Sequence, residues 1–241
     1  MVVSDIKIIK QGTLTLDWFE PPRSDILAMK YFCGIGGGST VTFLQSDANI
    51  LVDTGFEHES DVSERNKQAN QKRLIHALKE AGLFPRDIDI LFITHWHADH
   101  FMNRTIFEDC EVVMLKDAVD RHQLDITGIT AGKRIATGVM VLHTPGHTID
   151  HASLLVKTEN LRYTSRSRVG GRIMGIGSVN VVVAGDAVVS PSYFYNDTIW
   201  DHNQDFHSEE AAMASMKKIR GLADFIIPGH GGMFWNNRRC G

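Results

Sequence analysis

The sequence is poor in cysteine and has no long hydrophobic run. Its three cysteines are an odd number, and no two of them form a Cys-x-x-Cys pair. This usage excludes a disulfide framework and a cysteine zinc knuckle, and it favours a reducing, cytoplasmic location. The longest apolar runs, such as residues 181–184, fall far short of the roughly 20 residues that a membrane-spanning helix needs. Residues 1–7 also lack the features of a signal peptide, so we expect no membrane partner.

The chain also lacks an excess of positive charge. It carries 25 Lys and Arg against 29 Asp and Glu, which gives a net charge of −4. This balance disfavours nucleic acid as a partner. The 43% hydrophobic content is typical of a folded globular protein and excludes a disordered chain. Because the 241 residues contain no repeat and no linker rich in Pro or Ser, we expect a single domain over 1–241, and a homodimer is compatible with it.

Strand-like and helix-like segments alternate along the chain. Apolar, β-branched runs predict strands at 6–9, 13–16, 41–44, 50–52, 88–94, 135–142, 152–156, 179–184 and 225–227. A helix is expected over 64–81, followed by the helix breakers Gly82 and Pro85. A second helix is expected to begin after its N-cap Ser208 and to stop at Gly221. This alternation favours two sheets covered by helices.

Histidine is abundant, and several histidines are clustered. The expected strand over 90–93 leads into residues 94–100, which contain the motif His-x-His-x-Asp-His. His95 and His97 point the same way in an extended segment, so two imidazoles can bind one metal ion. Asp99 and His100 lie beyond the turn and can face a second ion. The alternative, a solvated polar loop, is disfavoured because a motif of this kind arises in about one shuffled sequence per thousand.

Three further polar residues each follow an apolar, strand-like run. They are His147 in Thr-Pro-Gly-His-Thr, Asp186 in Ala-Gly-Asp-Ala and His230 in Pro-Gly-His-Gly. A single loop histidine is more often structural than functional. Three such groups just beyond strand ends, where sheet proteins gather their sites, together predict a metal centre.

These motifs resemble those of the metallo-β-lactamase superfamily, in the family's order, from the strand ending at residues 52–55 to His230. The resemblance implies an α/β (α+β) fold, the four-layer αββα sandwich, with a two-metal site on one edge. By motif match, the first ion would be held by His95, His97 and His147, and the second by Asp99, His100 and His230, with Asp186 bridging both. Asp53 matches an early aspartate of the family that supports the ligands. Five imidazoles and two carboxylates suit two Zn²⁺ ions, with iron or manganese as alternatives.

Departures from related families narrow the expected function. Asp186 stands where many true β-lactamases have a cysteine or no bridging acid, which disfavours antibiotic hydrolysis. His97 replaces the glutamate of flavodiiron oxidoreductases, which disfavours reduction of oxygen or nitric oxide. Only eleven residues follow His230, too few for the helical domain of classical glyoxalase II. The ligand set still resembles that of lactonases and glyoxalase II. We therefore expect a metal-dependent hydrolase whose metal-bridging hydroxide attacks a small ester, thioester or lactone.

Other functions stay open at this point. A phosphodiesterase or ribonuclease could use the same metal ions, and a persulfide dioxygenase shares the first motif but uses a single iron. The third hypothesis is a non-catalytic, sensory protein. A complete ligand set argues against it. Without a metal ion, the clustered ligands would repel one another, and the cost of their desolvation would not be compensated.

Asp99 is the candidate for proton transfer, and two tyrosines are candidates for substrate binding. Asp99 is expected to orient the hydroxide and to pass its proton to the leaving group. In the aromatic stretch 190–200, Tyr195, or else Tyr193, resembles a lactonase tyrosine that binds a substrate carbonyl, although loop packing would explain it equally well. Trp96 either walls the pocket or packs under its loop.

A basic run occupies residues 157–172. An anionic substrate could bind to it, but a solvated hairpin is the favoured interpretation. The run consists of Lys157, Arg162, Arg166, Arg168 and Arg172.

Overall fold

Two β-sheets face each other in the computed structural model, which describes residues 2–14, 37–57, 63–159, 161–164 and 173–238. Within these residues the first sheet has the order β1-β2-β3-β4-β5-β6. Its strands are β1 (Asp5–Lys10), β2 (Val41–Gln45), β3 (Asn49–Val52), β4 (Ile90–Phe92), β5 (Glu111–Leu115) and β6 (Thr127–Ile129). The second sheet has the order β14-β13-β12-β9-β8-β7. Its strands are β7 (Arg134–Ala136), β8 (Val139–His143), β9 (Ala152–Thr158), β12 (Val179–Gly185), β13 (Phe225–Pro228) and β14 (Phe234–Trp235).

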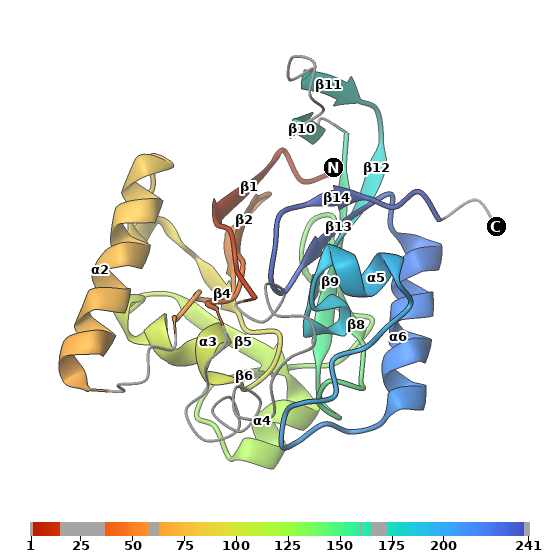
Figure 1. The fold of residues 1–241 in the computed structure, drawn as a ribbon. Helices are drawn as coiled ribbons and strands as arrows, with labels where there is room; N and C mark the ends of the chain where they lie inside the picture. Colours follow the sequence, from red (N-terminus) through yellow and green to blue (C-terminus); the bar gives the residue numbers. More distant parts are fainter. Residues whose placement is uncertain (1, 15–36, 58–62, 160, 165–172, 239–241) are drawn as a thin grey trace.

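Helices cover the outer faces of the two sheets. On one side lies α2 (Glu64–Glu80), and on the other lie α5 (Pro191–Tyr195) and α6 (Glu209–Leu222) (Figure 1). Two short helices, α3 (Ala98–Phe101) and α4 (Lys116–His122), follow strands of the first sheet. This arrangement confirms the predicted αββα sandwich. None of the helices in the described part of the chain combines the length and the apolar character that a bilayer crossing demands.

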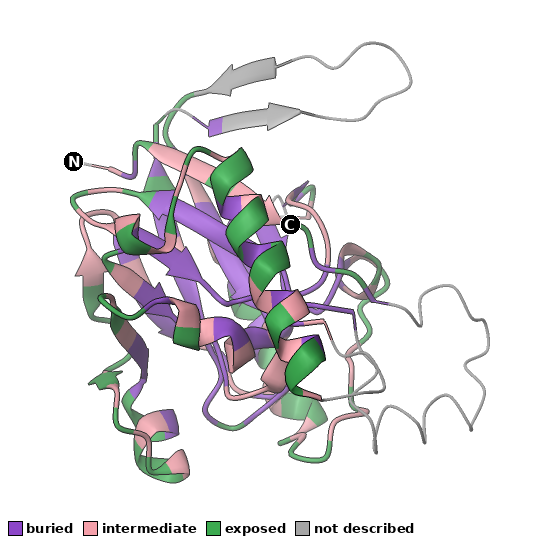
Figure 2. Cartoon of the chain, turned by 90° about the vertical axis from the view of Figure 1, so that its left-hand side faces the viewer, coloured by how far each residue is buried: buried purple, intermediate pink, exposed green. Residues whose placement is uncertain are grey.

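The alternation of side chains along β12 explains why the sandwich has two apolar layers. Val181 and Val183 point into the core between the sheets, whereas Val182 and Ala184 pack with Met216 of α6 in a second core. Successive residues of a strand face opposite sides, so one strand serves both layers. Figure 2 shows the resulting pattern, with buried strands behind the exposed outer face of α2.

The two predicted helices are confirmed to within two residues. Ser63 caps α2 by accepting a hydrogen bond from the backbone of Asn66, and Ser208 caps α6 in the same way from Ala211. Gly82 follows α2 with φ +77°, a left-handed conformation that glycine adopts without strain. Helix α6 continues through the expected stop at Gly221 and ends at Leu222.

The strand predictions are confirmed except at three places. Of the strand expected over 88–94, only Ile90–Phe92 forms β4. The run 135–142 is divided into β7 and β8 by a turn in which Gly138 has φ +79°. Of the strand expected at 13–16, Thr13 and Leu14 lie outside any strand, and the other two residues lie outside the described part of the chain. The strands β10 (Leu161–Thr164) and β11 (Ile173–Ile176) pair as a hairpin. The basic residues expected at 166, 168 and 172 lie outside the described residues.

Candidate metal centre

The predicted ligands lie beyond the carboxyl ends of strands, along one edge of the sandwich, with Asp99 and His100 in the short helix α3 that follows β4. His95 and His97 follow β4, and His147, Asp186 and His230 follow β8, β12 and β13. Strands β12 and β13 are parallel, and β8 runs in the same direction because both β8 and β12 are antiparallel to β9. Parallel strands bring their carboxyl ends to the same edge. The topology therefore gathers side chains from four segments of the chain.

The first group of ligands consists of three imidazoles. His97 Nδ1 lies 2.8 Å from His95 Nε2 and 3.0 Å from His147 Nε2. These atoms lie within 4.8 Å of one another and could hold a metal ion. A trio of imidazole nitrogens facing one point is typical of zinc coordination.

The second group combines imidazoles with a carboxylate. Asp99 Oδ2 lies 3.3 Å from His100 Nε2 and 3.4 Å from His230 Nε2. Asp186 connects this group to the first, because its Oδ2 lies 3.3 Å from His147 Nε2 and 3.5 Å from His230 Nε2. The structure thus brings all seven predicted ligands together, in the grouping that the motif match implied.

Asp53 and Thr94 orient the ligands from behind. Asp53 Oδ2 lies 2.8 Å from His100 Nδ1, and Asp53 also accepts hydrogen bonds from the backbone and hydroxyl of Thr94. Thr94 Oγ1 in turn lies 3.1 Å from His95 Nδ1. These contacts occupy the Nδ1 atoms and leave Nε2 of both imidazoles to face the centre. Asp53 therefore lies in the supporting position expected for it.

Two buried polar atoms without hydrogen-bond partners indicate that these residues fit a metal ion. His100 Nε2 and Asp186 Oδ1 are buried and have no hydrogen-bond partner among the described residues, although they lie 3.5 Å apart. Leaving such atoms unsatisfied is costly. A divalent cation would satisfy both, so the donor set and its geometry fit divalent metal ions.

Burial and mutual contact shift the pKa values of the cluster. Burial alone would raise the pKa of Asp186, but His230, His100 and His147 outweigh it and hold that pKa well below its ordinary value. Burial lowers the pKa of His147 to about 3 and that of His95 well below its ordinary value. At neutral pH these carboxylate and imidazole groups are therefore in the forms that bind a cation.

A close backbone approach places Asp186. A Cβ built on Gly229 would stand 1.7 Å from Asp186 Oδ1, closer than any two unbonded atoms can come. The backbone of Gly229 is fixed there, since its N–H donates to the carbonyl oxygens of Gly185 and Val188 and its own carbonyl accepts from Thr40. Only glycine fits at this position beside the Asp186 carboxylate.

The polar segment after residue 200 supplies a contact that the sequence did not reveal. Asp205 Oδ1 lies 2.8 Å from His97 Nε2 and accepts a hydrogen bond from Asn203. Burial would raise the pKa of Asp205, but the hydrogen bonds from His97 and Asn203 hold it below its ordinary value. The polar composition of 201–205 was the only signal, and it did not identify a partner.

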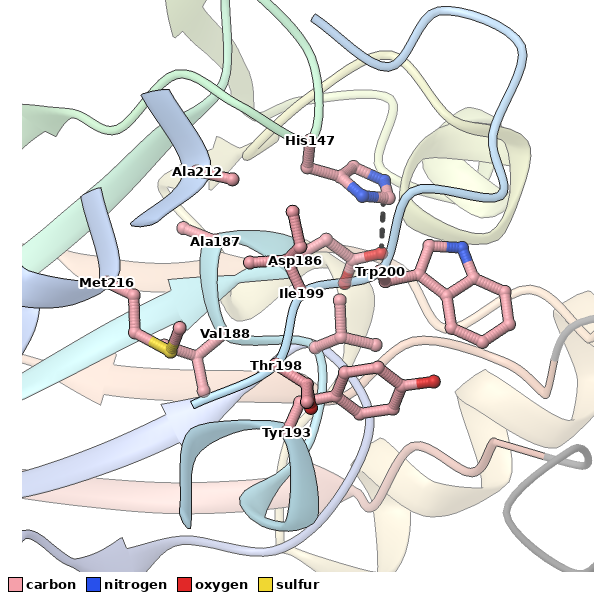
Figure 3. A pocket seen from close by; sticks show the side chains of 11 residues that line it. His147, Asp186, Ala187, Val188, Tyr193, Thr198, Ile199, Trp200, Ala212 and Met216 are labelled. Atoms are coloured by element: carbon pink, nitrogen blue, oxygen red, sulfur yellow. Dashed lines mark ion pairs between the residues drawn. The ribbon is translucent and has the colours of Figure 1, made fainter. Parts of the chain in front are cut away.

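A narrow pocket opens beside the cluster. It has a volume of about 10 Å³, room for about one water molecule, and its lining includes His147, Asp186, Tyr193 and Trp200. Figure 3 shows the apolar side chain of Met216 at one end and the rings of Tyr193 and Trp200 at the other. The described residues therefore leave room for only a small group at this position.

Tyr195, the tyrosine preferred from the sequence, makes a hydrogen bond away from the metal ligands. The Tyr195 hydroxyl donates to the carbonyl oxygen of Trp235 at 2.7 Å. Trp235 pairs with Phe225 at the start of β13, whereas His230 lies beyond the other end of that strand. Tyr193, by contrast, lines the pocket beside His147 and Asp186.

Trp96 packs under its loop. Its ring stacks on Phe101 with a centroid distance of 3.8 Å and an interplanar angle of 6°. It also belongs to the partly buried side chains around the main core. Of the two interpretations weighed for Trp96, the contacts favour packing over a wall of the pocket.

Comparisons with known proteins agree with this arrangement. The model of the metallo-beta-lactamase superfamily matches residues 34–103. The chain is 28% identical to metallo-beta-lactamase domain-containing protein 1 of Xenopus laevis, over 89% of this chain and 82% of that protein. It is 29% identical to an N-acyl homoserine lactonase of a Bacillus species, over 46% of this chain and 54% of that lactonase. The match thus spans about half the length of the lactonase.

A solved structure shares the fold. The N-acyl homoserine lactonase AiiA of Bacillus thuringiensis, with N-decanoyl-L-homoserine bound at its active site, superposes with a TM-score of 0.61. The identity is 18%, and the match covers 95% of this chain and 94% of that one. Sequence motifs, fold and ligand cluster agree: the chain matches the metallo-beta-lactamase superfamily over residues 34–103 and shares the fold of metal-dependent hydrolases of that superfamily.

Proposed function

We propose that the protein uses two divalent metal ions to hydrolyse a small ester, thioester or lactone. The observation that carries this proposal is the position of Asp186, whose carboxylate oxygens lie within 3.5 Å of nitrogen atoms of His100, His147 and His230. One carboxylate in contact with both ligand groups supports a shared, two-ion site. Such ions lower the pKa of bound water and stabilise negative charge that develops on the scissile group.

Each ligand residue has a defined part in this proposal. His95, His97 and His147 would hold the first ion, Asp99, His100 and His230 the second, and Asp186 would bridge them. The donor set of five imidazole nitrogens and two carboxylates favours Zn²⁺, while iron and manganese accept the same donors.

Asp99 is the candidate for proton transfer. Burial would raise its pKa, but the imidazoles of His100 and His230 hold it below its ordinary value, so the carboxylate is ionised at neutral pH. Its Oδ2 faces both imidazoles at 3.3 and 3.4 Å. From this position Asp99 would orient the attacking water, accept its proton and pass that proton to the leaving group.

Tyr193 is the candidate for substrate binding. It lines the same pocket as His147 and Asp186, and its ring meets that of Trp200 edge to face at 5.9 Å. A phenol hydroxyl there could donate a hydrogen bond to a substrate carbonyl. The likeness to N-acyl homoserine lactonases supports a carbonyl substrate of this kind.

The proposal also covers the domain organisation, the cellular location and the class of substrate. Phe43 of the first sheet and Val181 of the second belong to one apolar core, which supports a single domain over 1–241. The cysteine usage supports a cytoplasmic location. The net charge of −4 favours a small-molecule substrate over nucleic acid.

A substrate screen tests the proposal. Zinc-loaded protein and its Asp186→Asn variant would be assayed against lactones, thioesters, simple esters and phosphodiesters. We expect turnover of at least one carbonyl class by the unaltered protein and a loss of orders of magnitude in the variant. Turnover of phosphodiesters alone, with RNA binding that weakens steeply as salt rises, would overturn the substrate class. No turnover of any class by the metal-loaded protein would overturn the hydrolase proposal.

A further inference from the structure

The contact between Asp205 and His97 joins residues that are 108 positions apart in the sequence. Asp205 Oδ1 lies 2.8 Å from His97 Nε2, and on the other side of the same ring Nδ1 faces His95 and His147. A neutral imidazole carries one proton, and the nitrogen that keeps it cannot bind a metal ion. The carboxylate cannot donate, so it selects the form of His97 that carries its proton on Nε2.

We infer that Asp205 is a positioning residue that makes His97 a ligand through Nδ1. This inference rests on the metal site of the proposed function, and it adds to that site a residue outside the seven ligands. Asp205 would act through His97 in two ways. It holds the proton on Nε2, and it fixes the ring plane so that the Nδ1 lone pair meets those of His95 and His147.

The segment that carries Asp205 is itself attached to the loop of another ligand. Asn203 donates from Nδ2 to Asp205 Oδ1 at 2.9 Å and to the carbonyl oxygen of His147 at 2.7 Å. The backbone N–H of His207 donates to the carbonyl oxygen of Gly146 at 2.9 Å. Because of these bonds, the position of Asp205 is defined relative to the His147 loop. The segment 203–207 therefore fixes the position of His97 relative to His147.

Exposure sets the size of the expected effect. The side chain of Asp205 is 52% exposed and that of His97 is 23% exposed. Partners of metal-bound histidines typically contribute about 10- to 100-fold to metal affinity. Water can partly replace an exposed carboxylate, so we expect the lower end of that range, roughly tenfold, when Asp205 is removed.

The test compares Asp205→Ala with Asp201→Ala, a matched control on the same segment. Asp201 is similarly exposed, at 57%, and its carboxylate pairs with His202, a residue outside the ligand cluster. Two readouts are used: the affinity for each of two zinc ions, by competition with a chelator, and the protonation of the His97 ring nitrogens, by ¹⁵N NMR. The second readout is taken on metal-free as well as zinc-loaded protein.

In the unaltered protein and in Asp201→Ala, we expect the proton on Nε2 of His97. In Asp205→Ala, we expect a mixture of the two ring forms and roughly tenfold weaker binding of one zinc ion, with the other little changed. Asp205→Asn keeps an acceptor oxygen and should largely retain the Nε2–H form. Asp205→Ala with an unchanged ring form and unchanged zinc affinity would overturn the inference.

The NMR readout separates this inference from the proposed function. If the unaltered protein binds no zinc, the proposed function fails. The ring form of His97 in metal-free Asp205→Ala still decides whether Asp205 orients that imidazole.

Discussion

Gly229 lies so close to Asp186 that a single added methyl group would stand 1.7 Å from the Asp186 Oδ1 atom. The position of that carboxylate therefore depends on Gly229, the residue that directly follows β13. We predict that Gly229→Ala displaces Asp186, weakens metal binding and lowers the free energy of unfolding by about 1–3 kcal/mol, the usual cost of overpacking. Metal titration and chemical denaturation measure the two effects.

Gly221→Ala is the matched control for this change. Nothing lies within 4 Å of a Cβ at Gly221, which belongs to α6. Alanine is the better helix former, so this variant should keep its metal affinity and gain up to about 1 kcal/mol of stability. Unchanged metal binding in Gly229→Ala would show that Asp186 is not placed as described.

Asp186→Asn tests the bridge directly. The change removes a negative charge that faces His100, His147 and His230 while it keeps the shape of the side chain. We expect weaker binding of the second ion than of the first, and turnover lower by orders of magnitude, because an amide is a poorer bridge between two cations. Metal analysis of the purified variant and its rate measure these effects. A variant with full metal content and an unaltered rate would remove Asp186 from the site.

Tyr193→Phe and Tyr195→Phe form a pair that separates substrate binding from packing. Tyr193 lines the pocket, whereas the Tyr195 hydroxyl donates to the Trp235 carbonyl oxygen. Loss of a hydrogen bond to the developing oxyanion should lower kcat roughly ten- to a thousand-fold in Tyr193→Phe, with both metal ions retained. If the phenol acts only in binding the substrate, KM rises instead and kcat is unchanged.

Tyr195→Phe should leave kcat and KM unchanged and cost at most about 1 kcal/mol of stability. Wild-type kinetics in both single variants and in the double variant would rule out a tyrosine at the site.

The metal-free protein should lose stability in acid before its carboxylates titrate. Burial lowers the pKa of His147 to about 3 and lowers those of His95 and His151 well below the ordinary value. In the unfolded chain these imidazoles titrate near pH 6.5, so between about pH 6.5 and 3 the unfolded state binds more protons. The free energy of unfolding therefore falls as the pH falls through this window.

His100 and His230 do not offset the loss in acid. Burial lowers their pKa, but neighbouring carboxylates, Asp99 and Asp186 among them, outweigh it and raise the pKa above the ordinary value. The stability they contribute is complete below pH 6.5 and is lost only as the pH rises. Thermal unfolding of metal-free protein should therefore show a Tm that falls steadily from pH 6.5 to 4. A constant or rising Tm over that range would contradict the buried, neutral state of the three imidazoles.

Much of the site could be predicted because each ligand directly follows an apolar strand. The runs before His95, His147 and His230 are recognisable from composition alone, and the common direction of β8, β12 and β13 brings His147, Asp186 and His230 to one edge. The helix capped by Ser208 could also be predicted, because its N-cap and its apolar stripe depend only on residues close together in the sequence.

Contacts between distant segments could not be predicted in this way. Asp205 and His97 are separated by 108 residues, and no periodicity relates the polar segment to the His-x-His motif. Tyr193 and Tyr195 lie two positions apart, a spacing that places side chains on different faces of a helix. The sequence did not indicate that Pro191–Tyr195 is helical, so it could not decide which ring faces the pocket.

The number of metal ions per chain tests the central claim most directly. Seven candidate ligands exceed the three or four that a single zinc ion takes from a protein. Metal-free protein would be loaded with excess zinc, freed of unbound metal and weighed intact by native mass spectrometry. We predict a mass increase of about two zinc ions per chain, and about one after Asp186→Asn. A single ion per unaltered chain, in excess zinc and also in excess iron, would contradict the two-ion site and would favour a mononuclear enzyme.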